Sequence, residues 1–110
     1  MCNCLPGLEG TIDSVHVGTM HQSWVPGLAA RRTALAHTLS SHPRYEVEDT
    51  GYGIRAAAVR EVGEGRHYVC TTECVMPFTS LVAGSGSSRN GLMFISVPID
   101  NLTHMPFFGL

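Results

Sequence analysis

Hydrophobic residues in the first part of the chain recur with the spacing of a helix. The apolar positions of this stretch are Leu8, Ile12, Val15 and Met20. This spacing would bury one side of a helix that begins near Glu9, because Pro6 and Gly7 break regular structure just before it. Pro26 and Gly27 are stop signals, so the helical segment is expected to end before them.

A second, shorter helix is expected between residues 28 and 39, where alanine and leucine predominate. The polar residues 40–44 contain Pro43, which indicates a linker. Beyond Arg44 the hydrophobic pattern alternates with a period of two, which is typical of strands. The expected strands cover residues 45–48, 54–59, 67–75, 78–83 and 92–97, with turns at 49–53 and 63–65.

The end of the expected sheet has two irregular features. Pro77 follows the third strand and would turn its continuation into a bulge or an edge, since proline lacks the amide hydrogen. Residues 84–91 are rich in glycine and serine and are expected to form a loop. The apolar run from Leu92 continues to Leu110, so we expect the last strand to lack a neighbour and to promote self-association.

Helices followed by a run of antiparallel strands predict an α+β fold. With 110 residues, 44% of them hydrophobic, the chain can bury one modest core, so one domain is expected. The net charge is −2 with seven arginines and no lysine, a composition that offers no basic surface for nucleic acid. No apolar run approaches the roughly 20 residues of a membrane span, and the first residues lack a signal-peptide pattern, so a cytoplasmic protein without membrane contact is expected.

The candidate chemistry lies in the first helical segment, where Asp13, His16 and His21 follow one another closely. With about 100° of rotation per residue, the two histidines would lie about 140° apart on a straight helix, with Asp13 between them. A distortion at Gly18 would bring both rings toward one ion. Two imidazoles with open positions suit Fe(II) in a two-histidine, one-carboxylate site, and zinc is the competing metal. The alternative is a plain amphipathic helix without a metal site. The remaining histidines, which are not expected to be ligands, are His37, His42, His67 and His104.

The pattern around these residues is N-x5-E-G-x-I-D-S-x-H-x4-H, which runs from Asn3 to His21. It resembles the iron-binding segment of the Rieske non-haem iron aromatic-ring-hydroxylating oxygenases, of the phthalate dioxygenase and vanillate demethylase type. Three later stretches look like the sheet strands of the same catalytic domain: VEDTGYGIR, ECVMPFTSL and VPIDNLTHM. The resemblance covers most of the chain except residues 25–43.

The resemblance implies specific roles for the three side chains. His16 and His21 would bind one mononuclear Fe(II), and Asp13 would link one of them to a Rieske cluster in the neighbouring subunit. The implied fold is a helix-grip (START/Bet v1-like) domain, in which an antiparallel sheet wraps around a helix and encloses a cavity. The implied partners are a small aromatic substrate, an electron-donating reductase or ferredoxin, and further copies of the chain, as in the trimers of the family.

The sequence departs from the family pattern in two places. The third iron ligand of the family is a later aspartate with no counterpart here, and Asp49 and Asp100 are poor substitutes. A Rieske 2Fe-2S cluster needs C-x-H and C-x2-H pairs, and no cysteine here has a histidine two or three residues later. The four cysteines are expected to be thiols. Residues 1–110 are therefore expected to form a partial catalytic domain, with the cluster in a missing domain or a partner.

Two functions are compatible with these observations. The first is an oxidoreductase: a fragment of an oxygenase α-subunit that inserts oxygen from O2 into an aromatic or similar hydrophobic substrate at Fe(II). The second is a non-catalytic helix-grip module that binds a small molecule.

Overall fold

In the part of the chain that the structure describes, two short helices are followed by six strands. The structure, a computed structural model, describes residues 4–20, 40, 42–83 and 91–109. The helices are α1 Cys4–Ile12 and α2 Val15–Met20. The strands are β1 Arg44–Thr50, β2 Gly53–Glu61, β3 His67–Val75, β4 Thr79–Val82, β5 Leu92–Pro98 and β6 His104–Gly109. Each expected strand is found, and β3 has the bounds that the alternating pattern predicts.

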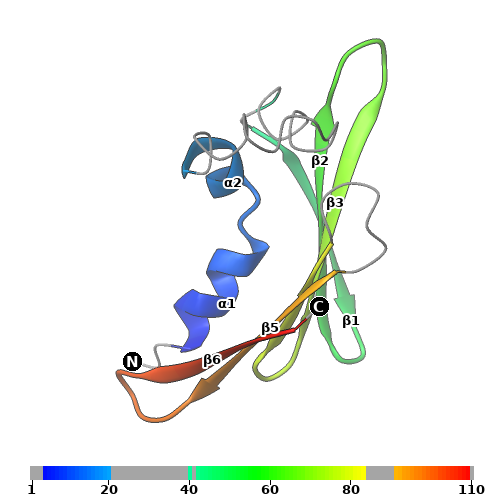
Figure 1. The fold of residues 1–110 in the computed structure, drawn as a ribbon. Coiled ribbons are helices and arrows are strands. Elements are labelled where there is room, and N and C mark those ends of the chain that lie inside the picture. Colours follow the sequence, from blue (N-terminus) through cyan, green and yellow to red (C-terminus); the bar gives the residue numbers. More distant parts are fainter. Residues whose placement is uncertain (1–3, 21–39, 41, 84–90, 110) are drawn as a thin grey trace.

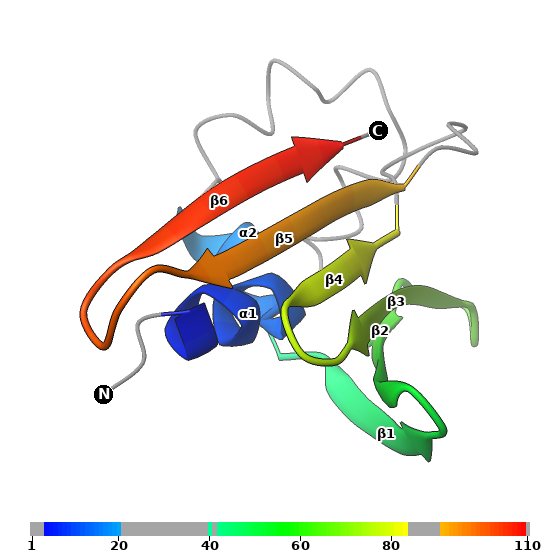
Figure 2. The ribbon, with the colours of Figure 1, turned by 90° about the horizontal axis from the view of Figure 1, so that it is seen from below.

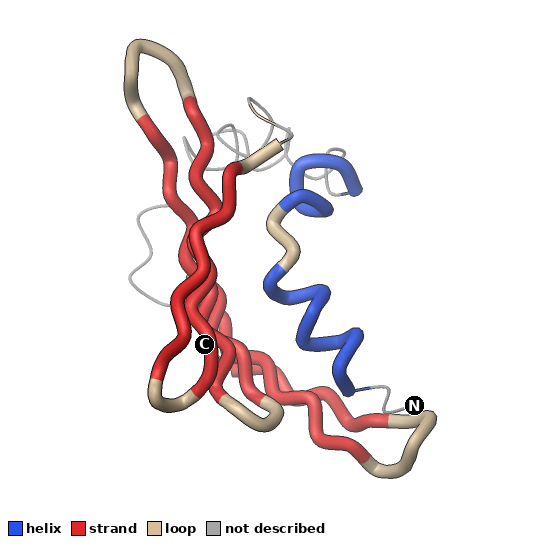
Figure 3. The backbone as a smooth tube through the Cα atoms, turned by 180° about the vertical axis from the view of Figure 1, so that it is seen from behind, coloured by secondary structure: helices blue, strands red, loops and turns tan. Residues whose placement is uncertain are grey.

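The six strands form one antiparallel sheet in which each strand pairs with the next along the chain. The sheet curves, and both helices lie on its concave side (Figures 1 and 3). Helix α1 packs against β3, β4 and β5, beneath the middle of the sheet (Figure 2). This arrangement confirms the predicted α+β class.

The sheet face that carries the helices buries mostly small side chains, with Arg60 as the exception. Its buried residues are Ala56, Ala58, Arg60, Cys70, Thr72, Cys74, Ser80 and Ser96. Helix α1 contributes Cys4 and Leu8 to this core. Helix α1 lies near the sheet at Gly7, where a Cβ atom would be 3.1 Å from the hydroxyl of Ser96 and 3.5 Å from Nε2 of His104. A glycine at this position therefore lets the helix backbone approach the sheet.

The start of the first helix differs from the prediction, since α1 begins at Cys4 rather than near Glu9. Pro6 falls in the first turn, where backbone amides have no partner within the helix, so the missing amide hydrogen of proline costs little. Cys4 is disulfide-bonded, which contradicts the expectation of a thiol, whereas Cys70 and Cys74 are thiols as expected. Among the residues described, no helix is long and apolar enough to cross a membrane.

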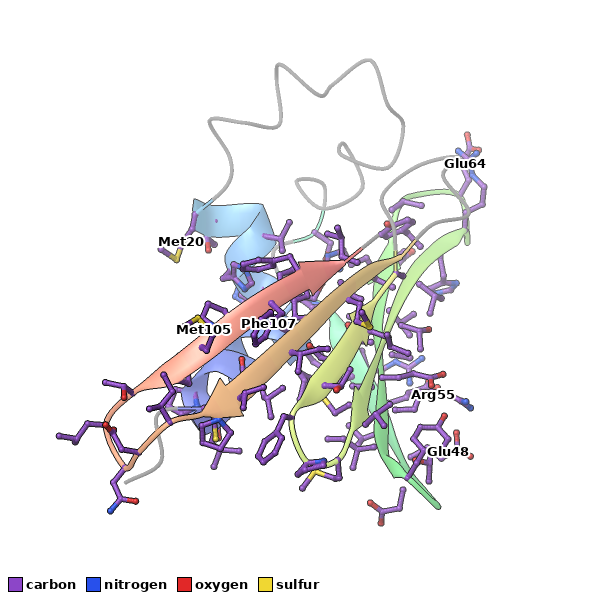
Figure 4. The ribbon with its side chains drawn as sticks, turned by 60° about the horizontal axis from the view of Figure 1, so that its bottom comes forward. Met20, Glu48, Arg55, Glu64, Met105 and Phe107 are labelled. Atoms are coloured by element: carbon purple, nitrogen blue, oxygen red, sulfur yellow. The ribbon has the colours of Figure 1, made fainter. Side chains whose placement is uncertain are left out.

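The opposite, outer face of the sheet has a polar part and an apolar part. On β1 and β2, Glu48 and Arg55 extend into solvent, whereas Met105 and Phe107 extend from β6 (Figure 4). Arg55 forms ion pairs with Glu48 at 3.2 Å and with Glu73 at 2.9 Å. The exposed apolar residues on the strands β4 to β6 of this face are Leu81, Met93, Val97, Met105 and Phe107.

Strand β6 pairs only with β5 among the described strands, so its other edge is open. The amide of Ser96 donates to the carbonyl of Phe78 on the β4 side, so the backbone groups of Ser96 point away from its β6 partner, Pro106. The backbone nitrogen of Pro106 consequently faces the open edge, where it has no hydrogen to donate. This proline weakens the edge as a template for strand pairing, which the sequence pattern did not anticipate.

Two other expectations concern loops and a helix. Pro77 lies in the turn between β3 and β4 rather than in a bulge or an edge strand. The helix expected at 28–39 and most of the loop expected at 84–91 lie outside the described residues. The turn expected at 63–65 is present, and Gly63, Glu64 and Gly65 all have positive φ angles there.

Candidate functional site

The helical segment is broken between α1 and α2, at Asp13 and Ser14. The amide of Asp13 still donates to the carbonyl of Glu9 at 3.0 Å, which closes the last turn of α1. The Oδ1 atom of Asp13 then accepts a hydrogen bond of 2.8 Å from the amide of Val15, the first residue of α2. The distortion predicted at Gly18 is wrong, since this glycine is buried inside α2. Aspartate and serine bond locally to the backbone, and here this tendency breaks the helix.

The break brings two of the three predicted site residues together. The Oδ2 atom of Asp13 lies 3.6 Å from Nδ1 of His16. The side chains are 48% and 31% exposed, respectively, so the pair lies at the surface of the helical segment without being fully solvated. Because Nδ1 faces the carboxylate, Nε2 is the nitrogen that would bind a metal. His21, the third predicted residue, lies outside the described residues.

Ser14, the residue between Asp13 and the start of α2, is bonded to two strands of the sheet. Its amide donates to the hydroxyl of Tyr45 on β1 at 2.7 Å. Its carbonyl and its hydroxyl both accept from Nη2 of Arg60 on β2, at 2.6 and 3.0 Å. Arg60 also donates from Nε to the carbonyl of Ser40 at 3.1 Å and is only 1% exposed. Its Nη1 atom has no hydrogen-bond partner among the described residues.

Sequence reasoning missed this arrangement. A signal for Arg60 was nevertheless present, because Arg60 follows Ala56 and Ala58 at alternate positions of one strand. A charged residue that continues the buried side of a strand needs a specific partner. The identity of that partner, a serine 46 residues earlier, was not readable from the pattern.

A cavity of about 420 Å³ lies between the helical segment and the sheet. Its helical wall is formed by Gly10, Thr11, Asp13, Ser14, His16 and Val17. Its sheet wall is formed by Cys70, Thr72, Val82, Ala83, Leu92 and Phe94. The ring of Phe94 packs edge-on against Phe108, with centroids 5.1 Å apart. The cavity therefore has polar and ionisable groups on the helical side and mainly apolar groups on the sheet side.

The sheet side of the cavity is poorly solvated. Burial raises the pKa of the Cys70 thiol, although the nearby positive charge of Arg60 opposes this shift. Burial likewise raises the pKa of Cys74, and it raises the pKa of Tyr68 on the same strand. Cys70 is therefore a protonated thiol of low reactivity at neutral pH.

The described residues fit a metal site only in part. One imidazole held by a carboxylate is the usual arrangement of a metal-bound histidine and its supporting group. Among residues 4–20, 40, 42–83 and 91–109, however, no three histidine, cysteine, aspartate or glutamate residues lie close enough to hold an ion. Asp100 instead accepts hydrogen bonds from the amides of Leu102 and Thr103 in the β5–β6 turn, and these bonds lower its pKa.

Comparison with known proteins identifies the family. The family model described as "LigXa C-terminal domain like" matches residues 1–109. The chain is 35% identical to the oxygenase subunit of phthalate 4,5-dioxygenase from Pseudomonas putida, over 97% of this chain and 26% of that protein. It is 32% identical to the oxygenase subunit of 3-chlorobenzoate-3,4-dioxygenase from Comamonas testosteroni, over 96% and 25%. The chain thus spans about a quarter of the length of these relatives. It belongs to the LigXa C-terminal domain-like family and corresponds to the C-terminal part of Rieske oxygenase α-subunits.

Proposed function

We propose that this chain forms part of the mononuclear iron domain of a ring-hydroxylating oxygenase. The observation that carries the proposal is the pairing of Asp13 with His16 on the wall of a cavity of about 420 Å³. A cavity of this size is within the range of sites that enclose small organic molecules. The similarity to two dioxygenase oxygenase subunits supports the same conclusion.

In this proposal His16 and His21 bind Fe(II), and the carboxylate of Asp13 orients the ring of His16. The chemistry that such an iron supplies when bound is the activation of O2. The chain itself contributes the orientation of the imidazole, through the contact of 3.6 Å between Asp13 and His16, and an apolar wall that keeps water from the substrate. A further ligand and an iron–sulfur cluster would come from residues beyond those described or from a partner.

The proposed substrate is a small aromatic acid. Phe94, Leu92 and Val82 give the sheet side of the cavity a surface that suits the face of a ring. The two relatives are named for phthalate and for 3-chlorobenzoate, which are both aromatic carboxylates. We also propose that the fold is of the helix-grip type and that the chain assembles into a homo-oligomer. Electrons would reach the iron from a reductase or ferredoxin through a Rieske 2Fe-2S cluster.

Metal content after anaerobic reconstitution with Fe(II) tests the proposal. The wild type should bind iron reversibly, and His16→Ala and His21→Ala should each abolish the binding. His67→Ala is the matched control, because His67 is an exposed histidine at the start of β3. Zinc should compete with iron, since affinity for imidazole ligands rises along the Irving–Williams order. Equal loss in all three variants, or no iron in the wild type, would contradict the proposal.

The second candidate is a small-molecule-binding module without catalysis. It requires only the cavity between the helical segment and the sheet, whose sheet side is mainly apolar. Calorimetric titration with benzoate separates the two candidates. Equal affinity for benzoate with and without Fe(II), in a chain that retains no iron, would support the binding module.

A further inference from the structure

Ser14 is the residue through which the candidate site is fastened to the sheet. Its amide, carbonyl and hydroxyl all bond to side chains of the sheet, Tyr45 on β1 and Arg60 on β2. The residue before it carries the carboxylate of the site, and the imidazole follows two residues after it. Any shift of Ser14 away from the sheet would therefore move Asp13 and His16 together, relative to the cavity that they line.

The cost of burying Arg60 indicates that its role is more than structural. The side chain is 1% exposed, and its hydrogen bonds to described residues go to neutral oxygens of Ser14 and Ser40. Among the residues that the structure describes, no carboxylate forms an ion pair with Arg60, and its Nη1 atom has no hydrogen-bond partner. An apolar side chain of similar length would avoid the desolvation of the charge at this position. The presence of an arginine at this position is explained if its branched guanidinium is needed to bond Ser14 and Ser40 at the same time.

We propose that Arg60 and Tyr45 are positioning residues for the iron site. They hold the break between α1 and α2 against the sheet, so that Asp13 and His16 face the cavity in a fixed orientation. Neither residue is among those that line the cavity. The inference rests on the proposed iron site for its metal readout, but the attachment of Ser14 is measurable without any metal.

Tyr45→Phe is the first test, because it removes only the hydroxyl that accepts the hydrogen bond from the amide of Ser14. Tyr52→Phe is the matched control: Tyr45 and Tyr52 are 37% and 42% exposed, and the Tyr52 hydroxyl bonds to Glu73 instead. In Tyr45→Phe, hydrogen exchange at the Ser14 amide should accelerate at least about tenfold, since it loses its acceptor. The Kd for Fe(II), measured anaerobically on the whole chain, should rise about tenfold. The control should change neither quantity, although it also removes a hydrogen-bonded tyrosine hydroxyl, one that contacts Glu73 and Arg55.

Arg60→Met is the second test, because it keeps the length of the side chain and removes the buried charge. If the role is positioning, this variant should unfold at the same temperature as the wild type or higher, yet bind Fe(II) at least about tenfold more weakly. Arg60→Lys should not restore tight binding, because an ammonium group cannot reproduce the branched contact. Arg55→Met, on the outer face of the same strand, should leave the Kd unchanged.

The outcomes separate this inference from the proposed function. Wild-type affinity for Fe(II) in both Tyr45→Phe and Arg60→Met would overturn the positioning role and leave the iron site in place. If the wild type binds no Fe(II), the proposed function fails, and hydrogen exchange at the Ser14 amide then tests the attachment of Ser14 to the sheet. An unchanged exchange rate in Tyr45→Phe would overturn that attachment as well. If Arg60→Met does not fold, the comparison of Tyr45→Phe with Tyr52→Phe still gives the answer.

Discussion

Asp13 makes two separate contacts, and Asp13→Asn removes only one of them. Oδ1 accepts from the amide of Val15 at 2.8 Å, and Oδ2 faces Nδ1 of His16 at 3.6 Å. An asparagine whose carbonyl takes the place of Oδ1 keeps the first contact. It then turns an amide group, a hydrogen-bond donor, toward the imidazole, which can no longer be held through a hydrogen on Nδ1.

The size of the effect follows from this division of roles. Loss of the carboxylate that supports a metal-bound histidine typically costs about 10- to 100-fold in metal affinity. This loss corresponds to about 1.4 to 2.8 kcal/mol of binding free energy. The free energy of unfolding should change little in Asp13→Asn, because the contact with Val15 remains. Asp13→Ala should also lose that helix-capping contact, with a further cost of about 0.5 to 2 kcal/mol in stability.

Anaerobic calorimetric titration with Fe(II), together with thermal unfolding, measures both quantities. The matched control is Asp100→Asn, since Asp100 likewise accepts backbone amides in a turn, from Leu102 and Thr103. That control should bind Fe(II) as the wild type does. If Asp13→Asn also binds Fe(II) with wild-type affinity, the carboxylate does not orient the imidazole and the reasoning is refuted.

Three other properties of the structure give predictions. Alkylation of Cys70 at neutral pH should be slow because burial raises the pKa of its thiol, and benzoate bound in the cavity should slow the alkylation further. Mass spectrometry of the labelled peptide measures the alkylation rate, and an equal rate with and without benzoate would contradict a ligand site in this cavity. Hydrogen bonds from Tyr52 and Arg55 lower the pKa of Glu73 in the folded protein. The ionised carboxylate therefore stabilises the fold above the pKa of glutamate in the unfolded chain, and this stability is lost as the pH falls through the pKa of Glu73 in the folded protein. Glu73→Gln should flatten this part of the plot of unfolding free energy against pH. The exposed apolar outer face should promote self-association, which Phe107→Ser should reduce in light scattering, and a strictly monomeric wild type at micromolar concentration would contradict this.

Five of the six described strands were predictable because their signals are local, whereas β6 was not predicted as a separate strand. Alternation of apolar and polar residues indicates the strands at 45–48 and 67–75, and turn residues separate neighbouring strands, as at Gly63 to Gly65. Consecutive antiparallel strands joined by short connections then pair in chain order. The start of α1 was not predictable in the same way, because Pro6 and Gly7 are breakers inside a helix but are tolerated in its first turn.

The candidate site was predictable only where its contacts are close in sequence. Asp13 and His16 are three residues apart, so the motif alone placed them side by side. The break that orients them is held by Tyr45 and Arg60, which lie 31 and 46 residues from Ser14. No periodicity encodes such a contact, since it depends on how the sheet curves around the helical segment. For this reason the sequence predicted the distortion at Gly18, which lies inside α2, rather than at Asp13 and Ser14.

The break at Asp13 and Ser14 also accounts for the position of the cavity. At its other end α1 lies so near the sheet that a Cβ on Gly7 would crowd the hydroxyl of Ser96. A straight helix from that contact would continue along the sheet, whereas here the chain ends one helix, bonds through Ser14 to β1 and β2, and starts a second helix. The cavity is lined by residues on both sides of this break and by strands β3 to β5 across from it. One local feature therefore both opens the space for a ligand and turns His16 toward it, so a substitution that straightens the helix should lose the cavity and the orientation of the imidazole together.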